Sequence, residues 1–201
     1  MITANHCQEI FDRCITDYHL TDSVDQPINN PYPEDSIDHT LYLKAWVDTV
    51  QWHYEDLIRD PKIDPVDGMA LKRKIDKSNQ HRTDLVEQLD DYFLEQFANV
   101  EYTEDARINS ESPAWVIDRL SILALKLYHM MEQVERADVD LEHQQTSQSK
   151  LKVLEEQKAD LSLSFDELLM DIAAGVRKMK VYRQMKLYND PKTNPVFYKN
   201  D

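Results

Sequence analysis

The residues best able to do chemistry form an uninterrupted polar run in the middle of the chain. From Asp76 to Asp84, nine consecutive residues carry no apolar side chain. A helix in a bundle directs a side chain towards the core in every turn, so part of this run must face inward. A buried polar side chain needs a hydrogen-bond partner or a ligand. The run therefore predicts a polar centre between helices.

Two neighbouring predicted helices bring polar side chains to the same level. If the preceding helix lies antiparallel across a turn at residues 60–68, Lys44 and Asp48 come beside the run. The next helix adds polar residues to a half that is otherwise apolar. The candidate ligand-binding residues of this groove are Gln51, Glu55, Asp76, Asn79, Gln80, Arg82, Asp118, Arg119, Ser121 and Lys126.

Two interpretations of this polar centre stay open. In one, the charges form a self-satisfied network of ion pairs, with Arg119 and Lys126 paired to carboxylates such as Asp166 or Asp171. In the other, Arg82, Arg119 and Lys126 are held for an anionic ligand. Both interpretations predict that Arg119 and Lys126 lie where neighbouring helices surround them.

Patterns typical of metal sites and nucleophilic active sites are missing from the sequence. A di-iron bundle uses Glu-x-x-His pairs, and none of the seven histidines has a glutamate three residues before it. His53, Glu55 and Asp56 form a local cluster without metal-ligand spacing, which is typical of a helix surface. The chain also lacks a glycine-rich phosphate loop and a nucleophile elbow. We therefore expect no metal and no cofactor, and we assign no catalytic residue.

Prolines mark the ends of the helices that must position these residues. Proline is absent from 34–60, 66–112 and 114–190, so the long helices lie there. With only two glycines, the chain has few residues suited to the tight turns of β-structures. Apolar periodicity predicts helices over about 3–20, 36–59 and 64–100, and two more after Ser112 that form an antiparallel hairpin turning near 142–149. The expected fold is an all-α five-helix bundle with a long C-terminal helical hairpin.

The hairpin changes character along its length. Up to Met131 its off-seam faces are apolar, but from Glu132 they are charged, so a tip over about 132–162 should protrude from the bundle. Its apolar seam extends to Met179, which predicts that the last helix ends in the basic stretch 177–186. The three small residues at 173–175 should lie opposite Asp118 and either allow close helix contact or leave room for a ligand. We expect one domain over 1–201, with an extended tail at 190–201.

Composition restricts the setting and the partners. The formal net charge of −15 opposes binding to nucleic acids and anionic membranes. No apolar run is long enough to span a bilayer, and residues 1–11 do not resemble a signal peptide. Cys7 and Cys14 are expected as reduced, half-buried thiols. These features predict a cytoplasmic protein that does not insert into membranes.

Three segments together resemble a bacterial family described only as a domain of unknown function. The similarity spans about residues 29–129. It is carried by Gln51, Trp52, His53, Glu55, Asp56 and Arg59, by Lys74, Ile75, Asp76, Asn79, Gln80, Arg82 and Asp84, and by Asp118, Arg119, Leu120, Ser121, Ile122, Leu123 and Lys126. The resemblance implies an all-helical cytosolic protein and supplies no activity.

Two classes of function follow from the sequence. The first is a non-enzymatic accessory or interaction protein, whose groove and hairpin bind a protein partner or a small anionic ligand. The second is a small all-helical enzyme acting on an anionic metabolite, with Arg82, Arg119 and Lys126 binding its charge and Glu55, Asp76 or Asp118 as acid or base. The exposed leucines expected at the hairpin tip also predict a homodimer.

Overall fold

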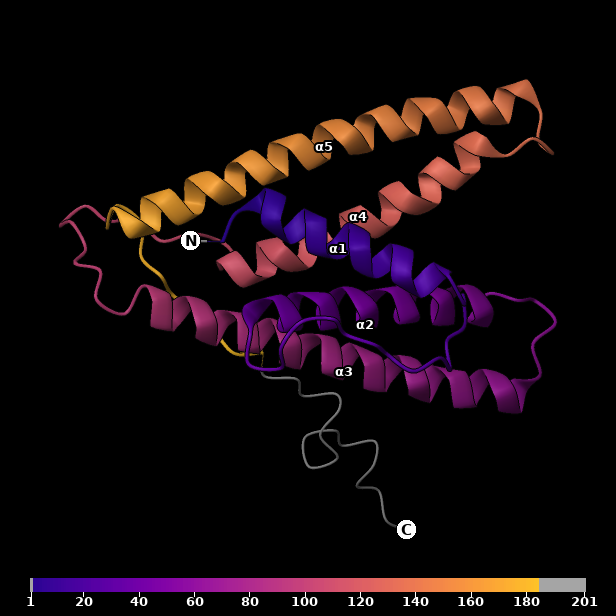
Figure 1. Ribbon diagram of the computed structural model, residues 1–201, viewed down its shortest axis with the longest axis horizontal. Helices are drawn as coiled ribbons and strands as arrows, with labels where there is room; N and C mark the ends of the chain where they lie inside the picture. Colours follow the sequence, from indigo (N-terminus) through magenta and orange to yellow (C-terminus); the bar gives the residue numbers. More distant parts are fainter. Residues whose placement is uncertain (1, 185–201) are drawn as a thin grey trace, which may run out of the picture.

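Five α-helices make up the computed structural model, which describes residues 2–184 (Figure 1). They are α1 (Ala4–His19), α2 (Ile37–Ile58), α3 (Pro65–Gln96), α4 (Pro113–Glu135) and α5 (Leu141–Ala173). Within the described residues the only β-type pairing is an isolated bridge between Arg107 and Arg177. The predicted all-α bundle is confirmed.

Each helix begins at a side chain that accepts a hydrogen bond from the first turn. Thr3, Ser36, Asp64, Ser112 and Asp140 are the N-caps of α1 to α5 in that order. Proline follows the cap in α3 and α4, where its missing N–H costs nothing. These local signals explain why the predicted helix starts agree closely with the observed ones in the first four helices.

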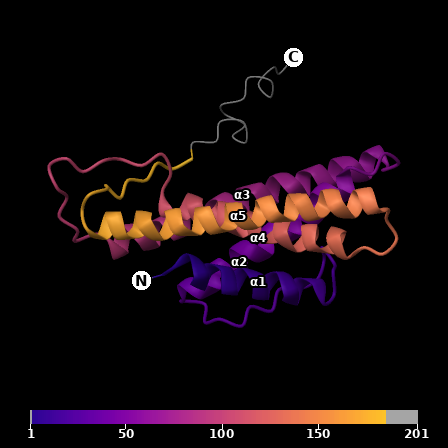
Figure 2. The ribbon, with the colours of Figure 1, turned by 90° about the horizontal axis from the view of Figure 1, so that it is seen from above.

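Two helical hairpins pack with α1 into one bundle. Figure 1 shows α2 antiparallel to α3 and α4 antiparallel to α5, with α1 packed against α2, α4 and α5. In the view from above, α1 and α2 lie on one side of the α4–α5 pair (Figure 2). The core at their junction contains fully buried aromatic rings, among them Phe11, Tyr18, Tyr42, Phe93 and Phe165. Among the described residues, no helix has the length and apolar character needed to cross a membrane.

The turn of the C-terminal hairpin lies earlier than predicted. It occupies residues 136–140, and α5 begins at Leu141 behind the cap Asp140. The polar stretch 142–149, predicted as the turn, is the first part of α5. Polar side chains there need no break in the helix because nearly all of them face solvent, Ser147 excepted. Between residues 132 and 162, only Ser147 and Leu151 are buried, in keeping with a tip outside the main core.

The last helix also ends earlier than predicted. It stops at Ala173, and Gly175 then adopts a left-handed φ of +72°. The chain continues beside residues 103–107, with hydrogen bonds from Thr103 N to Gly175 O and from Arg107 N to Val176 O, both 3.0 Å. The basic residues from Arg177 onward are therefore not helical in the described part of the chain. The predicted tail at 190–201 lies outside the described residues.

Of the three small residues at 173–175, Ala173 and Ala174 are exposed, and Gly175 is in close backbone contact that leaves no room for a ligand beside it. A Cβ atom on Gly175 would lie 2.2 Å from the carbonyl oxygen of Glu101. Glycine is required here both for the backbone angle and for this close approach.

Both cysteines are more buried than expected. Cys7 and Cys14 are free thiols with no exposed surface. Burial, together with the nearby carboxylates Asp166 and Asp38, raises the pKa of Cys7 to about 12. Cys14 lies against α2, where its thiol donates to the carbonyl of Tyr42 at 3.3 Å. These thiols fill the core, as predicted, but neither is half-buried.

The two glycines provide a matched test of this fold. Gly175→Ala should destabilise the protein by more than about 2 kcal/mol, because it combines a left-handed residue with a backbone clash. Gly68→Ala should be neutral or stabilising by up to about 1 kcal/mol, because Gly68 lies in α3, where alanine is favoured over glycine. A Cβ atom there would lie 3.7 Å from the Ile63 side chain, which is an ordinary contact. Urea unfolding followed by circular dichroism measures both. Equal stability of the two variants would contradict the role given to Gly175.

Candidate functional site

At the predicted polar centre, four charged side chains form a network, in which three are buried and Arg82 is partly exposed. Lys44 and Asp48 come from α2, Arg82 from α3 and Asp118 from α4. Lys44 contacts Asp48 and lies 3.0 Å from Asp118, while Arg82 donates two hydrogen bonds to Asp118 at 2.8 and 2.6 Å. Ser121 adds a hydrogen bond of 2.5 Å to Asp48. Two cations and two carboxylates thus neutralise one another.

The two carboxyl groups of this network are held differently. Burial raises the pKa of Asp48, although Lys44 and Arg82 oppose the rise. Burial acts in the same direction on Asp118, but there Lys44 and Arg82 outweigh it, and the pKa of Asp118 lies below its ordinary value. Asp118 is therefore the firmly ionised anchor of the network.

Other predicted groove residues lie at the margin of this network. Gln51 donates to the Asn79 side chain at 2.8 Å and accepts from Ser78 at 3.1 Å, which links α2 to α3. Glu55 lies one turn further along α2, 3.7 Å from Arg59. Beside these residues is a cavity of about 200 Å³. Its lining is Asp48, Gln51, Trp52, Glu55, Arg59, Arg82, Ile122 and Leu125.

Four of the predicted residues do not reach the polar centre. Asp76 pairs with Lys72, and Gln80 with Asp84, along the outer face of α3. Arg119 pairs at 2.9 Å with Glu111, and Lys126 is exposed.

The expectation that neighbouring helices surround Arg119 and Lys126 is wrong. They are seven residues apart and so share one face of α4, and that face is turned to solvent. The carboxylates expected to pair with Arg119 and Lys126 contact other groups instead. Asp166 accepts from the N–H of Ala4 at 2.8 Å, and Asp171 pairs with Arg177.

The same substitution at two lysines tests this arrangement. Lys44→Met should destabilise the protein by about 3–5 kcal/mol, because it leaves buried carboxylates without their cation. Lys126→Met should change the stability by less than about 0.5 kcal/mol, since Lys126 faces solvent. Chemical unfolding of both variants and the parent provides the comparison. A large loss of stability in Lys126→Met together with a small one in Lys44→Met would refute this assignment of buried and exposed lysines.

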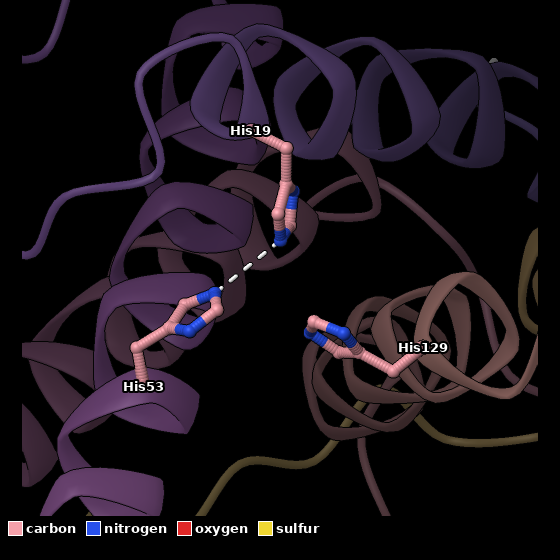
Figure 3. Close-up of side chains that lie close together, drawn as sticks. All are labelled: His19, His53 and His129. Atoms are coloured by element: carbon pink, nitrogen blue, oxygen red, sulfur yellow. Dashed lines mark hydrogen bonds between the residues drawn. The ribbon is translucent and has the colours of Figure 1, made fainter. Parts of the chain in front are cut away.

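A second constellation, not predicted from the sequence, consists of three histidines from three helices. His19 ends α1, His53 lies near the end of α2, and His129 lies in the last third of α4. Their rings point towards one another (Figure 3), and one nitrogen from each lies within 4.8 Å of the other two. The Nε2 atoms of His19 and His53 are 3.3 Å apart.

Hydrogen bonds at the far side of two rings determine which nitrogen faces the cluster. Nδ1 of His19 lies 2.7 Å from the carbonyl oxygen of Ile15, and Nδ1 of His129 lies 2.7 Å from a carboxylate oxygen of Glu132. These oxygens only accept, so each Nδ1 carries the proton and each Nε2 presents a lone pair. Nε2 of His129 is buried and has no hydrogen-bond partner among the described residues.

Aromatic rings hold the imidazoles in place. Tyr18 stacks on His53 with centroids 5.1 Å apart, Trp52 on His129 at 5.0 Å, and Tyr128 on His19 at 4.2 Å. Burial lowers the pKa of His53; nearby Asp22 opposes this change, and His19 and His129 add to it. The site therefore favours the neutral form of His53, which is the form that coordinates metal ions.

The sequence carries no local signal for this cluster, and the residues around His53 indicate a helix surface. The three histidines are separated by 34 and 76 residues, so no local spacing connects them. Each also lies on a helix whose other residues follow an ordinary bundle pattern. Only the packing of α1, α2 and α4 brings them together.

Comparison with known proteins gives one match. The model of the family described as "Protein of unknown function (DUF4254)" matches residues 38–181. This range contains His53, His129 and all the groove residues predicted from the sequence, and it begins after His19. No curated protein and no solved structure matches the chain.

Proposed function

The chain belongs to the DUF4254 family, and from its geometry we propose that it binds a divalent transition-metal ion through His19, His53 and His129. Zn²⁺ is the ion that fits best, because imidazole nitrogens in tetrahedral arrangement are among its usual ligands. The protein would then be a metal-binding accessory protein, in line with the non-enzymatic function expected from the sequence.

The convergence of one ring nitrogen from each of three histidines is the observation that carries this proposal. Zn–N bonds of about 2.0–2.1 Å in a tetrahedral site place ligand nitrogens roughly 3.3–3.4 Å apart. The 3.3 Å between His19 and His53 already matches that spacing. The Nδ1 atoms of His19 and His129 are bonded to a carbonyl and a carboxylate, as is usual for metal-binding histidines. A metal ion would also satisfy the buried Nε2 of His129.

Metal titration of single histidine variants tests the proposal. Chelator-treated protein should bind one equivalent of Zn²⁺, and excess Zn²⁺ should raise its melting temperature. His53→Gln and His129→Gln should each weaken binding by at least about 100-fold, since each removes a direct ligand. His81→Gln is the control, because His81 is an exposed residue of α3. Calorimetry and thermal unfolding provide the readouts, and failure of the wild type to bind Zn²⁺ or Co²⁺ would refute the proposal.

The cavity between α2, α3 and α4 supports a second candidate function, the binding of a small polar ligand. Asp48 lines this cavity, and its Oδ1 is buried without a hydrogen bond among the described residues, although Nε of Arg82 lies 3.5 Å away. A ligand with a hydrogen-bond donor would satisfy that oxygen, and the Trp52 ring offers a flat apolar wall. The enzyme alternative has less support, because Arg82 is neutralised by Asp118 while Arg119 and Lys126 face solvent.

A thermal-shift screen addresses this second candidate. Small amines, hydroxylated compounds and amino acids are the appropriate panel, because Asp48 requires a donor. A compound that stabilises the wild type should lose its effect in Glu55→Ala, which changes the wall of the cavity, and keep it in Glu87→Ala on α3. Equal shifts in both variants would refute binding in this cavity.

We also propose where the protein is located and what it assembles with. Free thiols at Cys7 and Cys14 support a reducing compartment such as the cytoplasm. Of the tip leucines expected to be exposed, Leu141 is 74% exposed, whereas Leu151 is buried and Leu154 is partly buried. Together with Val153, which is 63% exposed, Leu141 offers an apolar contact for a protein partner or a second copy of the chain. The net charge of −15 supports partners other than nucleic acids.

A further inference from the structure

Asp22 lies beside the histidine cluster and has an unusual backbone conformation. It follows His19 by three residues, and its φ is +52°, the one positive value for a residue other than glycine in the described part of the chain. Its N–H donates to the carbonyl of Tyr18 at 3.0 Å, so the chain turns back over the end of α1. This turn brings Oδ1 of Asp22 to 3.7 Å from Nε2 of His53.

Asp22 lies on the His53 side of the cluster. Its carboxylate is near Nε2 of His53 but is not within 4.8 Å of the ligand nitrogens of all three histidines, so it must turn to reach the centre of the cluster.

We propose that Asp22 is the fourth ligand of the metal ion, so that the site is a closed three-histidine, one-carboxylate centre. This inference rests on the proposed metal binding. A carboxylate oxygen is an ordinary ligand of Zn²⁺, and three neutral imidazoles leave the ion's charge for it to offset. The Asp22 side chain is 58% exposed, so it turns towards an ion without disturbing the core.

A closed site has a definite consequence for what the ion does. Three-histidine zinc sites with a catalytic function keep water at the fourth position, whereas structural sites fill all four with protein ligands. With Asp22 coordinated, the ion ties the beginning of the α1–α2 connection to α2 and α4. It then acts as a structural cross-link of three helices and not as a centre that activates water.

Cobalt substitution with an added anion distinguishes a closed site from an open one. Co²⁺-loaded wild-type protein should show tetrahedral absorption bands that azide leaves unchanged. Asp22→Gly should open the fourth position, so that azide alters the bands, and should weaken Zn²⁺ binding by at least about 10-fold. Glycine accepts the positive φ, and Asp22→Asn, which also tolerates it, separates loss of charge from any change in the backbone. Asp25→Gly is the control, because Asp25 lies in the same connection and pairs with Lys74 instead.

Hydrogen exchange supplies a readout that is independent of spectroscopy. Zn²⁺ should slow amide exchange in residues 20–36 of the wild type and of Asp25→Gly, but not in Asp22→Gly. Azide binding to wild-type Co²⁺ protein, with equal Zn²⁺ affinity in Asp22→Gly, would overturn the role of Asp22 while leaving the three-histidine site intact. Absence of Zn²⁺ and Co²⁺ binding by the wild type would instead refute the proposed function itself.

Discussion

The buried pairing of Lys44 and Arg82 with Asp48 and Asp118 is the constraint on which the rest of the structure depends. Lys44, Asp48 and Asp118 are removed from water, while Arg82 is partly exposed, and the buried charges are tolerable only beside their partners. The pairing therefore permits one register between α2, α3 and α4, since a shift of one residue along any helix would separate them. Such networks add little net stability, but they penalise alternative packings strongly.

That register also determines the position of the histidines. His53 follows Asp48 by five residues on α2, and His129 follows Ser121 by eight on α4. Asp48 and Ser121 are hydrogen-bonded, so His53 and His129 come together further along the same two helices. The end of α1 then supplies His19, because Phe11 and Tyr18 anchor that helix in the core against α2 and α4.

The two polar centres differ in what their groups lack. In the charge network nearly every donor and acceptor has a partner within the protein. In the histidine cluster, hydrogen bonds and stacked rings hold one nitrogen of each imidazole near those of the other two, and Nε2 of His129 has no hydrogen-bond partner among the described residues. The charges of the first arrangement neutralise one another, although Oδ1 of Asp48 lacks a hydrogen bond among the described residues. A cation would satisfy the second arrangement, and this supports metal binding as the leading proposal.

Local patterns in the sequence determined the helices and most of their boundaries. Apolar periodicity, proline after a capping residue and the shortage of glycine all act over one or two turns, so they can be read without knowing the fold. The turn of the C-terminal hairpin and the end of its last helix were predicted wrongly for the same reason. A polar stretch at 142–149 and an apolar seam beyond Gly175 are local signals, whereas the cap at Asp140 and the approach of Gly175 to Glu101 decided the actual ends.

The sequence also indicated that polar residues meet between α2, α3 and α4, and Asp48, Arg82, Asp118 and Ser121 do so. It could not tell which charges face inward, because Asp118 and Arg119 are adjacent and only the rotation of α4 separates them. The histidine cluster was beyond its reach altogether. Its members come from three helices far apart in the chain, and tertiary packing alone, by setting the register and rotation of those helices, brings their nitrogens to one point.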